Sequence, residues 1–167
     1  MKPNTNGMSE SLESTAQQVA DYLLGSGQQL ATAESCTGGW IAKLLTDIAG
    51  SSEWFERGFV TYSNAAKQEM LGVSGQALAK HGAVSEAVVQ EMVSGALAHS
   101  RASIALSVSG IAGPGGGTAE KPVGTVWFAW QREGASPVTA CQQFPGDRDA
   151  VRRQAVIVAL KGLLALN

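Results

Sequence analysis

Apolar residues along the chain alternate between helical and strand spacing, which predicts an α/β domain. In some segments they recur every three or four positions, as on the buried face of an amphipathic helix. In others they alternate, or run continuously over a few residues, as in half-buried or fully buried strands. Helices are predicted at residues 12–24, 40–48, 75–80, 85–98 and 147–163, with one more that includes Lys67 near its start. Strands are predicted at residues 28–33, 58–63, 104–108, 124–130 and 138–144.

The order of these elements fits a three-layer α/β/α sandwich, in which helices cover both faces of one sheet. The nearly continuous apolar run at 104–108 indicates a strand buried on both faces. The last two strands are joined through residues 132–136, a link short enough for a hairpin, so this part of the sheet is predicted to be antiparallel. The expected sheet is therefore mixed.

Composition agrees with one domain and narrows the class of protein. The 167 residues are 44% hydrophobic and 16% charged, enough for the core of one domain, which we place at 11–167 behind a flexible tail at 1–10. We see no apolar leader and no bilayer-spanning run, so we expect a cytoplasmic protein with no membrane partner. A net charge of −2 argues against a nucleic-acid partner. Cys36 and Cys141 form no CxxC pair and are predicted to be reduced thiols.

Residues 32–39 predict a strand-to-helix turn that carries a candidate nucleophile, Ser35. Glycines let a backbone approach a ligand closely, and the N–H groups at a helix start attract a developing oxyanion. The predicted oxyanion donors are the backbone N–H groups of Thr37, Gly38 and Gly39. The alternative is that Ser35 and Thr37 only cap the helix that begins near Trp40.

A serine hydroxyl requires a base, and Lys67 is the candidate. A buried lysine amine can titrate low enough to accept a proton, as in the Ser-Lys variant of serine hydrolases. Tyr62 and Lys67 lie on either side of a second predicted strand-to-helix turn, so Tyr62 can relay the proton or hydrogen-bond the lysine and fix its position. The alternatives are a Lys67 extended into solvent and a Tyr62 packed in the core.

A Gly-rich loop at 109–122 follows a buried strand. It lacks the Gly-Lys-Ser/Thr ending of a P-loop and the spacing of a dinucleotide fingerprint, so neither ATP nor NAD is indicated as a cofactor. Ser109 and Gly110 come directly off the strand and are predicted to line the substrate pocket. The alternative for 115–120 is a flexible surface loop.

Arg148 and Arg152 lie one turn apart at the start of the last helix. A helix N-terminus with guanidinium groups is suited to a phosphate, so both arginines are predicted to bind substrate. The alternative is a solvated face in which Arg148, Arg152 and Arg153 pair with Asp147 and Asp149. Asp147 is predicted to be the N-cap of this helix, and no metal site is expected.

Four segments together resemble the CinA C-terminal domain family: residues 33–39, 58–67, 107–114 and 144–152. The resemblance runs from about Leu12 to Leu164, in the same order and without an obvious gap. Characterised members of the family are nicotinamide mononucleotide deamidases of the PncC type, and the chain looks like the stand-alone form. The resemblance implies a substrate, nicotinamide mononucleotide, which would be hydrolysed to nicotinic acid mononucleotide and ammonia, and it implies a homodimer.

The expected mechanism is acyl transfer, in which Lys67, assisted by Tyr62, activates Ser35 for attack on the nicotinamide carboxamide. No cofactor is expected. Two alternatives remain open at this stage. One is a non-catalytic nucleotide-binding or regulatory module, in which the same residues only hydrogen-bond a ligand, and the other is a Ser-Lys hydrolase of another amide.

Overall fold

Five strands form a single mixed sheet in a computed structural model of the chain, which describes residues 6–166, with side chains from Leu12 onward. The strand order across the sheet is β2-β1-β3-β4-β5. β1 runs parallel to β2 and β3, whereas β4 runs antiparallel to β3 and β5, so the predicted mixed sheet and hairpin are confirmed. The strands are β1 (Leu30–Glu34), β2 (Phe55–Val60), β3 (Ile104–Gly110), β4 (Thr125–Arg132) and β5 (Val138–Gln143).

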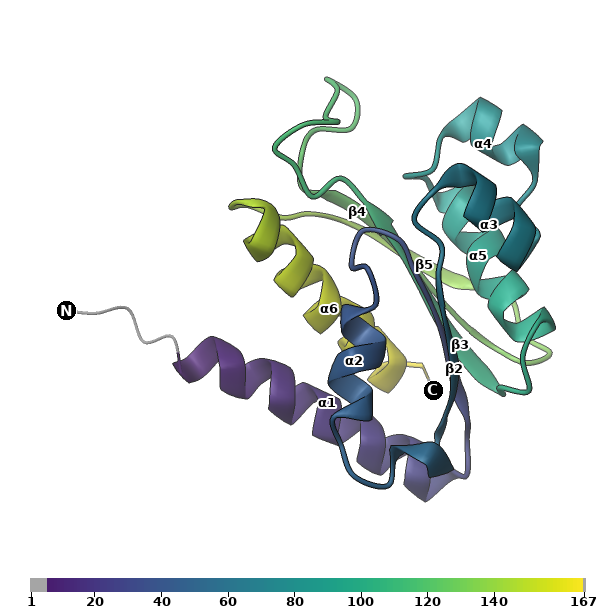
Figure 1. The fold of residues 1–167 in the computed structure, drawn as a ribbon, viewed down its shortest axis with the longest axis vertical. Helices are drawn as coiled ribbons and strands as arrows, with labels where there is room; N and C mark the ends of the chain where they lie inside the picture. The colour runs from purple at the N-terminus through teal and green to yellow at the C-terminus, as the bar shows by residue number, and fades with distance from the viewer. Residues whose placement is uncertain (1–5, 167) are drawn as a thin grey trace.

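Helices cover both faces of the sheet, which confirms the three-layer α/β/α sandwich (Figure 1). One layer contains α1 (Asn6–Ser26), α2 (Trp40–Thr46) and α6 (Arg148–Leu164). The other contains α3 (Asn64–Leu71), α4 (Gly75–His81) and α5 (Glu86–Ala98). The predicted order of helices and strands is confirmed, with one added 3-10 turn, η1 (Ser51–Glu53), before β2. Within residues 6–166, no helix has the length and apolar character needed to cross a membrane.

Two elements differ from the sequence expectation by more than two residues at a boundary. β2 begins at Phe55 and ends at Val60, whereas the pattern predicted 58–63. β2 is an edge strand whose first half carries charged residues, so it shows no apolar run there, and residues 61–63 leave the sheet to form the turn into α3. Helix α1 begins at Asn6, within the segment 1–10 that was predicted to be a flexible tail, and residues 1–5 lie outside the described residues.

Two glycines let helices approach their neighbours more closely than any other residue would allow. A Cβ atom on Gly162 of α6 would lie 2.0 Å from the Trp130 ring of β4. One on Gly95 of α5 would lie 1.9 Å from the carbonyl oxygen of Leu71 in α3. Both distances are far below van der Waals contact, so glycine is required at each crossing. These crossings set how α6 and α3 pack on the rest of the domain.

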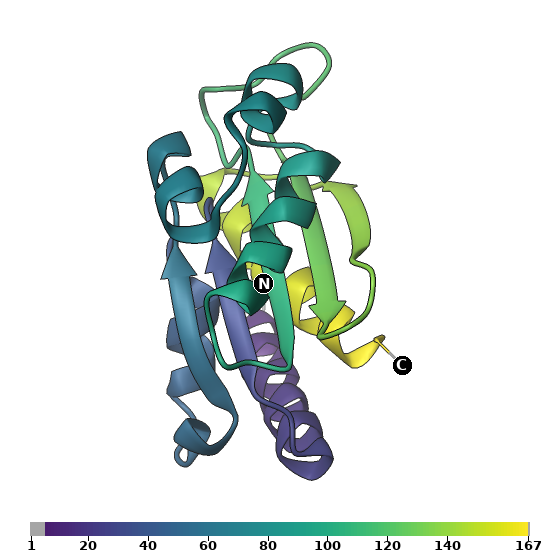
Figure 2. The ribbon, with the colours of Figure 1, turned by 90° about the vertical axis from the view of Figure 1, so that its right-hand side faces the viewer.

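The parallel strands end at one edge of the sheet, and the predicted site segments gather there. β1, β2 and β3 all point toward the end of the molecule where the Gly-rich loop and the N-terminal end of α6 lie (Figures 1 and 2). In α/β proteins, ligands bind in the crevice outside the carboxyl ends of such strands. The topology therefore brings four segments that are distant in sequence to one place.

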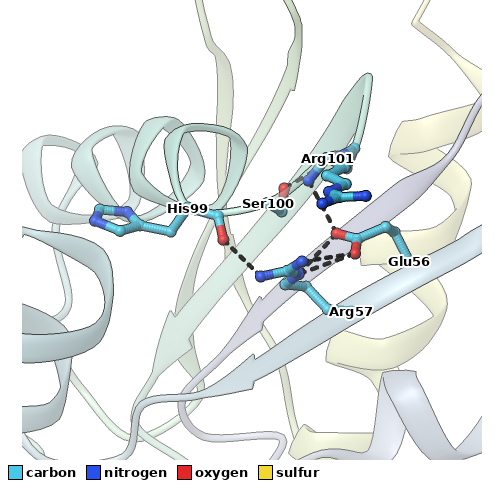
Figure 3. Close-up of polar contacts among 6 residues, drawn as sticks. Glu56, Arg57, His99, Ser100 and Arg101 are labelled. Carbon is cyan, nitrogen blue, oxygen red and sulfur yellow. Dashed lines mark hydrogen bonds and ion pairs between the residues drawn. The ribbon is translucent and has the colours of Figure 1, made fainter.

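Polar contacts fix the opposite end of β2 (Figure 3). The Arg57 guanidinium pairs with Glu56 at 2.8 Å and donates to the carbonyl oxygen of His99 at 3.0 Å. The Glu56 carboxylate also accepts a hydrogen bond from the N–H of Arg101 at 3.0 Å. The hydrogen bond from Arg57 is the main cause that lowers the pKa of Glu56. These contacts tie the edge strand to the loop between α5 and β3.

Candidate active site

Ser35 lies at the end of β1, where the chain turns from the sheet into α2. Its N–H donates to the carbonyl oxygen of Val108 at 3.0 Å, which continues the pairing of β1 with β3 by one residue. The side chain is 7% exposed. Gly38 and Gly39 then adopt positive φ values of 61° and 101°, which other residues rarely adopt, so this tight turn depends on glycine.

Glu34 holds this turn from the inside, a role that the sequence pattern did not predict. Its buried carboxylate accepts hydrogen bonds from the Thr37 hydroxyl at 2.6 Å and from the N–H groups of Ile41 and Ala42 at 2.9 and 3.1 Å. The helix start is thereby capped by Glu34, so the alternative in which Ser35 and Thr37 are its caps is wrong. A carboxylate at the end of a predicted, mostly apolar strand, shortly before a helix start, was the available signal.

The Glu34 cap also limits which N–H groups can face an oxyanion. Those of Ile41 and Ala42 in the first turn of α2 are occupied by the carboxylate. Of the predicted donors, Gly38 uses its N–H on the carbonyl oxygen of Ser35, at 3.0 Å. Within the described part of the chain, the N–H groups of Thr37 and Gly39 have no acceptor. A role for these two N–H groups as oxyanion donors stays a prediction.

Lys67 is buried beside Ser35, which excludes the alternative of a side chain extended into solvent. It is 1% exposed, and its Nζ lies 2.9 Å from Ser35 Oγ, 2.9 Å from the carbonyl oxygen of Thr61 and 3.1 Å from that of Tyr62. Carbonyl oxygens only accept hydrogen bonds. As an ammonium, Lys67 can donate to all three neighbours; as a neutral amine, it donates its two N–H groups to the carbonyls and its lone pair is left facing the serine hydroxyl.

The surroundings of Lys67 favour that neutral form. Burial lowers the pKa of Lys67, because the charged ammonium loses its water. Among the described residues, no carboxylate forms an ion pair with it, since the nearby Glu34 is turned toward α2. The group placed against Ser35 is thus suited to accept a proton.

Tyr62 contributes to the lysine site through its backbone. Its carbonyl oxygen accepts from Lys67, whereas its hydroxyl accepts from Arg148 Nη2 at 3.1 Å. The side chain is 61% exposed, so the alternative of a core tyrosine is wrong. A role for the hydroxyl as a proton relay stays a prediction.

Arg148 links three of the four segments that the sequence analysis singled out. Besides Tyr62, it contacts the Gly-rich loop, where its Nη1 donates to the carbonyl oxygen of Gly113 at 2.7 Å. Asp147, just before it, accepts from the N–H of Ala150 at 2.9 Å, which confirms the predicted N-cap of α6. Arg148 is exposed at this edge of the sheet.

Arg152, one turn further along α6, contacts the nucleophile turn. Its Nε donates to the carbonyl oxygen of Cys36 at 3.0 Å, and its Nη2 donates to that of Thr37 at 3.2 Å. Arg153 instead pairs with Asp149 at 3.5 Å. The alternative of a solvated, acid-paired face therefore describes Arg153 and not Arg152.

Ser109 and Gly110 are the last two residues of β3, which pairs with β1 next to Ser35. The Ser109 hydroxyl is buried and donates to the carbonyl oxygen of Ala83 at 2.9 Å. A Cβ on Gly110 would lie 2.6 Å from Val126 Cγ2, so the close packing of β3 on β4 accounts for this glycine. Contact of either residue with a substrate stays a prediction.

Both cysteines are free thiols, as predicted. Burial raises the pKa of the Cys36 thiol to about 12, so this neighbour of Ser35 is a poor nucleophile at neutral pH. Over the described residues, no group of three or more His, Cys, Asp or Glu side chains is placed to hold a metal ion.

Comparisons with known proteins agree with this architecture. A family model of the CinA C-terminal domain matches residues 12–166. The nicotinamide-nucleotide amidohydrolase PncC of Escherichia coli strain K12 is 61% identical over 148 residues, which are 89% of this chain and 90% of that protein. The protein of the same name from Pseudomonas putida is 53% identical over 152 residues, or 91% and 94% of the two chains.

A solved structure shows the same fold. The competence/damage inducible protein CihA from Agrobacterium tumefaciens superposes with a TM-score of 0.90 and 46% sequence identity, over 94% of this chain and 96% of that one. The family model covers nearly all the described residues, including every segment of the candidate site. The chain therefore belongs to the CinA C-terminal domain family.

Proposed function

We propose that this protein hydrolyses the carboxamide of nicotinamide mononucleotide, giving nicotinic acid mononucleotide and ammonia, with Ser35 as nucleophile and Lys67 as base. The observation that carries the proposal is the buried Lys67 Nζ, 2.9 Å from Ser35 Oγ, with two carbonyl oxygens to take its N–H groups. The names of the relatives from E. coli and P. putida support the substrate class.

In the first half of the reaction, Lys67 takes the Ser35 proton while the serine oxygen attacks the carboxamide carbon. The oxyanion that forms on the carboxamide oxygen meets the free N–H groups of Thr37 and Gly39. Each well-placed donor of this kind contributes roughly 3 kcal/mol to the transition state. Lys67 then returns the proton to the leaving nitrogen, ammonia departs, and Ser35 holds the nicotinoyl group as an ester.

In the second half, water attacks the ester carbon and Lys67 takes a proton from that water. The tetrahedral intermediate collapses, Ser35 regains its proton, and the carboxylate product leaves. The pyridinium ring of the mononucleotide withdraws electrons from the carboxamide in both steps. Free nicotinamide lacks this activation and is expected to be a poor substrate.

Arg148 is our proposed phosphate ligand, because it is exposed beside the site at the N-terminal end of α6. Its guanidinium and the helix N-terminus attract the phosphate together. Ser109, Gly110 and Arg152 are the other predicted substrate contacts, and Tyr62 is the predicted proton relay. A homodimer in the cytoplasm remains our prediction for the assembly and location.

Ammonia release from a small panel of amides tests the proposal. The panel contains nicotinamide mononucleotide, its dephosphorylated riboside, free nicotinamide and an unrelated primary amide. We expect turnover of the mononucleotide to exceed that of the others. Turnover of the unrelated amide alone would indicate a Ser-Lys hydrolase of another substrate. Binding of the mononucleotide without ammonia release would indicate a non-catalytic nucleotide-binding module.

A further inference from the structure

The nucleophile turn is held from the outside by one residue that lies more than a hundred positions away in the chain. Arg152 reaches from α6 to the turn and donates to two successive carbonyl oxygens, those of Cys36 and Thr37, at 3.0 and 3.2 Å. Its guanidinium also lies 5.6 Å from the centre of the Trp40 ring, within cation–π distance. The two carbonyl oxygens and the Trp40 ring therefore fix the position of the Arg152 guanidinium.

The two carbonyls belong to the peptide groups that carry the N–H groups of Thr37 and Gly38, and that of Gly38 donates to the carbonyl oxygen of Ser35. The carbonyl of Cys36 shares its peptide group with the N–H of Thr37, which has no acceptor among residues 6–166. A charged donor on a peptide carbonyl polarises the whole group, and this makes the N–H on its other side a stronger donor. Arg152 thus acts on the peptide group whose N–H has no acceptor among the described residues.

We infer that Arg152 is a positioning residue, which holds the nucleophile turn and strengthens the Thr37 N–H as an oxyanion donor. This inference rests on the proposed function, and it assigns Arg152 a different task from the phosphate contact predicted from sequence. To reach a phosphate, the guanidinium would have to release two buried carbonyl oxygens. Arg148 has no such tie to the nucleophile turn: its two contacts are to Tyr62 and Gly113.

Arg153 is a matched control supplied by the chain itself. It is the next residue on α6, and its guanidinium lies 5.3 Å from the same Trp40 ring. Its side-chain hydrogen bond goes to Asp149 on the helix surface, not to the turn. Replacing Arg153 removes a charge and a ring contact at the same place and leaves both turn carbonyls with their donors.

Steady-state kinetics with the mononucleotide and the riboside test the inference in Arg152→Gln, Arg152→Lys and Arg153→Gln. Loss of one oxyanion donor costs about 100- to 1,000-fold in kcat. Since Arg152→Gln weakens the donor without removing it, we expect kcat to fall roughly 10- to 100-fold with both substrates. KM should change little. Arg152→Lys keeps the charge but cannot contact both carbonyls as the guanidinium does, so its kcat should lie between those of the parent and Arg152→Gln. The kcat of Arg153→Gln should match that of the parent.

Circular dichroism and thermal unfolding confirm that each variant is folded, and a small guanidinium salt added to Arg152→Gly should restore part of kcat. If Arg152 only stabilised the fold, the salt would not restore kcat and KM would not stay unchanged. A raised KM for the mononucleotide alone, with the riboside unaffected, would show that Arg152 contacts the phosphate and would overturn the inference.

Labelling of Ser35 by a fluorophosphonate separates this inference from the proposed substrate. In that step the serine oxygen bonds to phosphorus, fluoride leaves, and Lys67 takes the proton, so the rate reports on the turn without the mononucleotide. We expect Arg152→Gln to label roughly tenfold or more slowly than the parent and Arg153→Gln. Equal rates would overturn the inference even if the parent hydrolyses the mononucleotide. A labelled parent that releases no ammonia would refute only the substrate, and a parent that does neither would refute both.

Discussion

Lys67 has lost nearly all contact with water but keeps three polar neighbours. Two of these are carbonyl oxygens and the third is the Ser35 hydroxyl. The carbonyls orient the amine, while burial lowers its pKa from the usual value of 10.5. A base whose pKa approaches the working pH is unprotonated often enough to act in each turnover.

The lowered pKa of Lys67 predicts how activity depends on pH. Only the neutral amine accepts the Ser35 proton, so kcat/KM should rise with pH and level off above the pKa of Lys67, which lies below 10.5. Lys67→Arg should be inactive throughout, because a guanidinium stays protonated. Lys161→Arg, an exposed change on α6, should follow the parent profile. A parent rate that falls as pH rises from 6 to 9 would contradict the assignment of Lys67 as base.

The phosphate contact proposed for Arg148 is also tested by a single residue. Arg148→Ala should chiefly raise KM for the mononucleotide, by about 30-fold, since a charge-assisted hydrogen bond contributes roughly 2 kcal/mol. The riboside, which has no phosphate, should be nearly indifferent to the change. The four values of kcat/KM form a double-mutant cycle between the guanidinium and the phosphate. Equal losses with both substrates would mean that Arg148 does not contact the phosphate.

At the scale of elements, the strand-turn-helix unit from β1 to α2 shows what periodicity can and cannot predict. The apolar strand, the glycine turn and the helix start follow from residue types alone. The Glu34 cap did not, because a carboxylate in a buried run looks like an interruption of the pattern. The hydrogen bonds from Arg152 to the carbonyl oxygens of Cys36 and Thr37 join residues more than a hundred positions apart, and no local pattern contains such a contact.

Glu34→Gln tests the cap of α2. The amide nitrogen cannot accept a hydrogen bond, so at least one of the buried donors at Thr37, Ile41 and Ala42 loses its partner. We expect the free energy of unfolding in urea to fall by about 1 to 3 kcal/mol, the cost of one unsatisfied buried group. Glu133→Gln, on the exposed hairpin between β4 and β5, is the matched control and should be neutral. Equal free energies of unfolding for the two variants would contradict the role of Glu34 in stabilising the turn.

At the scale of the molecule, the order β2-β1-β3 places the carboxyl ends of three parallel strands together, and α6 returns the chain to the same edge. The sequence predicted the elements and the antiparallel hairpin, but not the order of strands across the sheet, because the parallel pairings depend on contacts distant in sequence. The predicted bounds of the edge strand β2 were wrong by three residues for the same reason. Its position depends on its pairing with β1 and on the Glu56–Arg57 contacts.

Packing between layers is tested by a pair of helical glycines. Gly162→Ala places a Cβ 2.0 Å from the Trp130 ring, whereas a Cβ on Gly25 in α1 meets nothing within 4 Å. The first change should lower the free energy of unfolding by about 1 to 3 kcal/mol through overpacking. Gly25→Ala should raise it by about 0.5 to 1 kcal/mol, because alanine is the better helix former. Similar effects of the two substitutions would contradict the close crossing of α6 over β4.

The central claim is that Ser35 attacks the substrate, and the rate of ammonia release by Ser35→Ala tests it most directly. The measurement compares Ser35→Ala, shown to be folded, with the parent and with Ser136→Ala, an exposed change in the β4–β5 hairpin. The account predicts that Ser35→Ala loses at least about a thousandfold in the rate of mononucleotide hydrolysis, since a lost nucleophile costs several orders of magnitude. Ser136→Ala should match the parent. A folded Ser35→Ala within about tenfold of the parent rate would contradict covalent catalysis by Ser35.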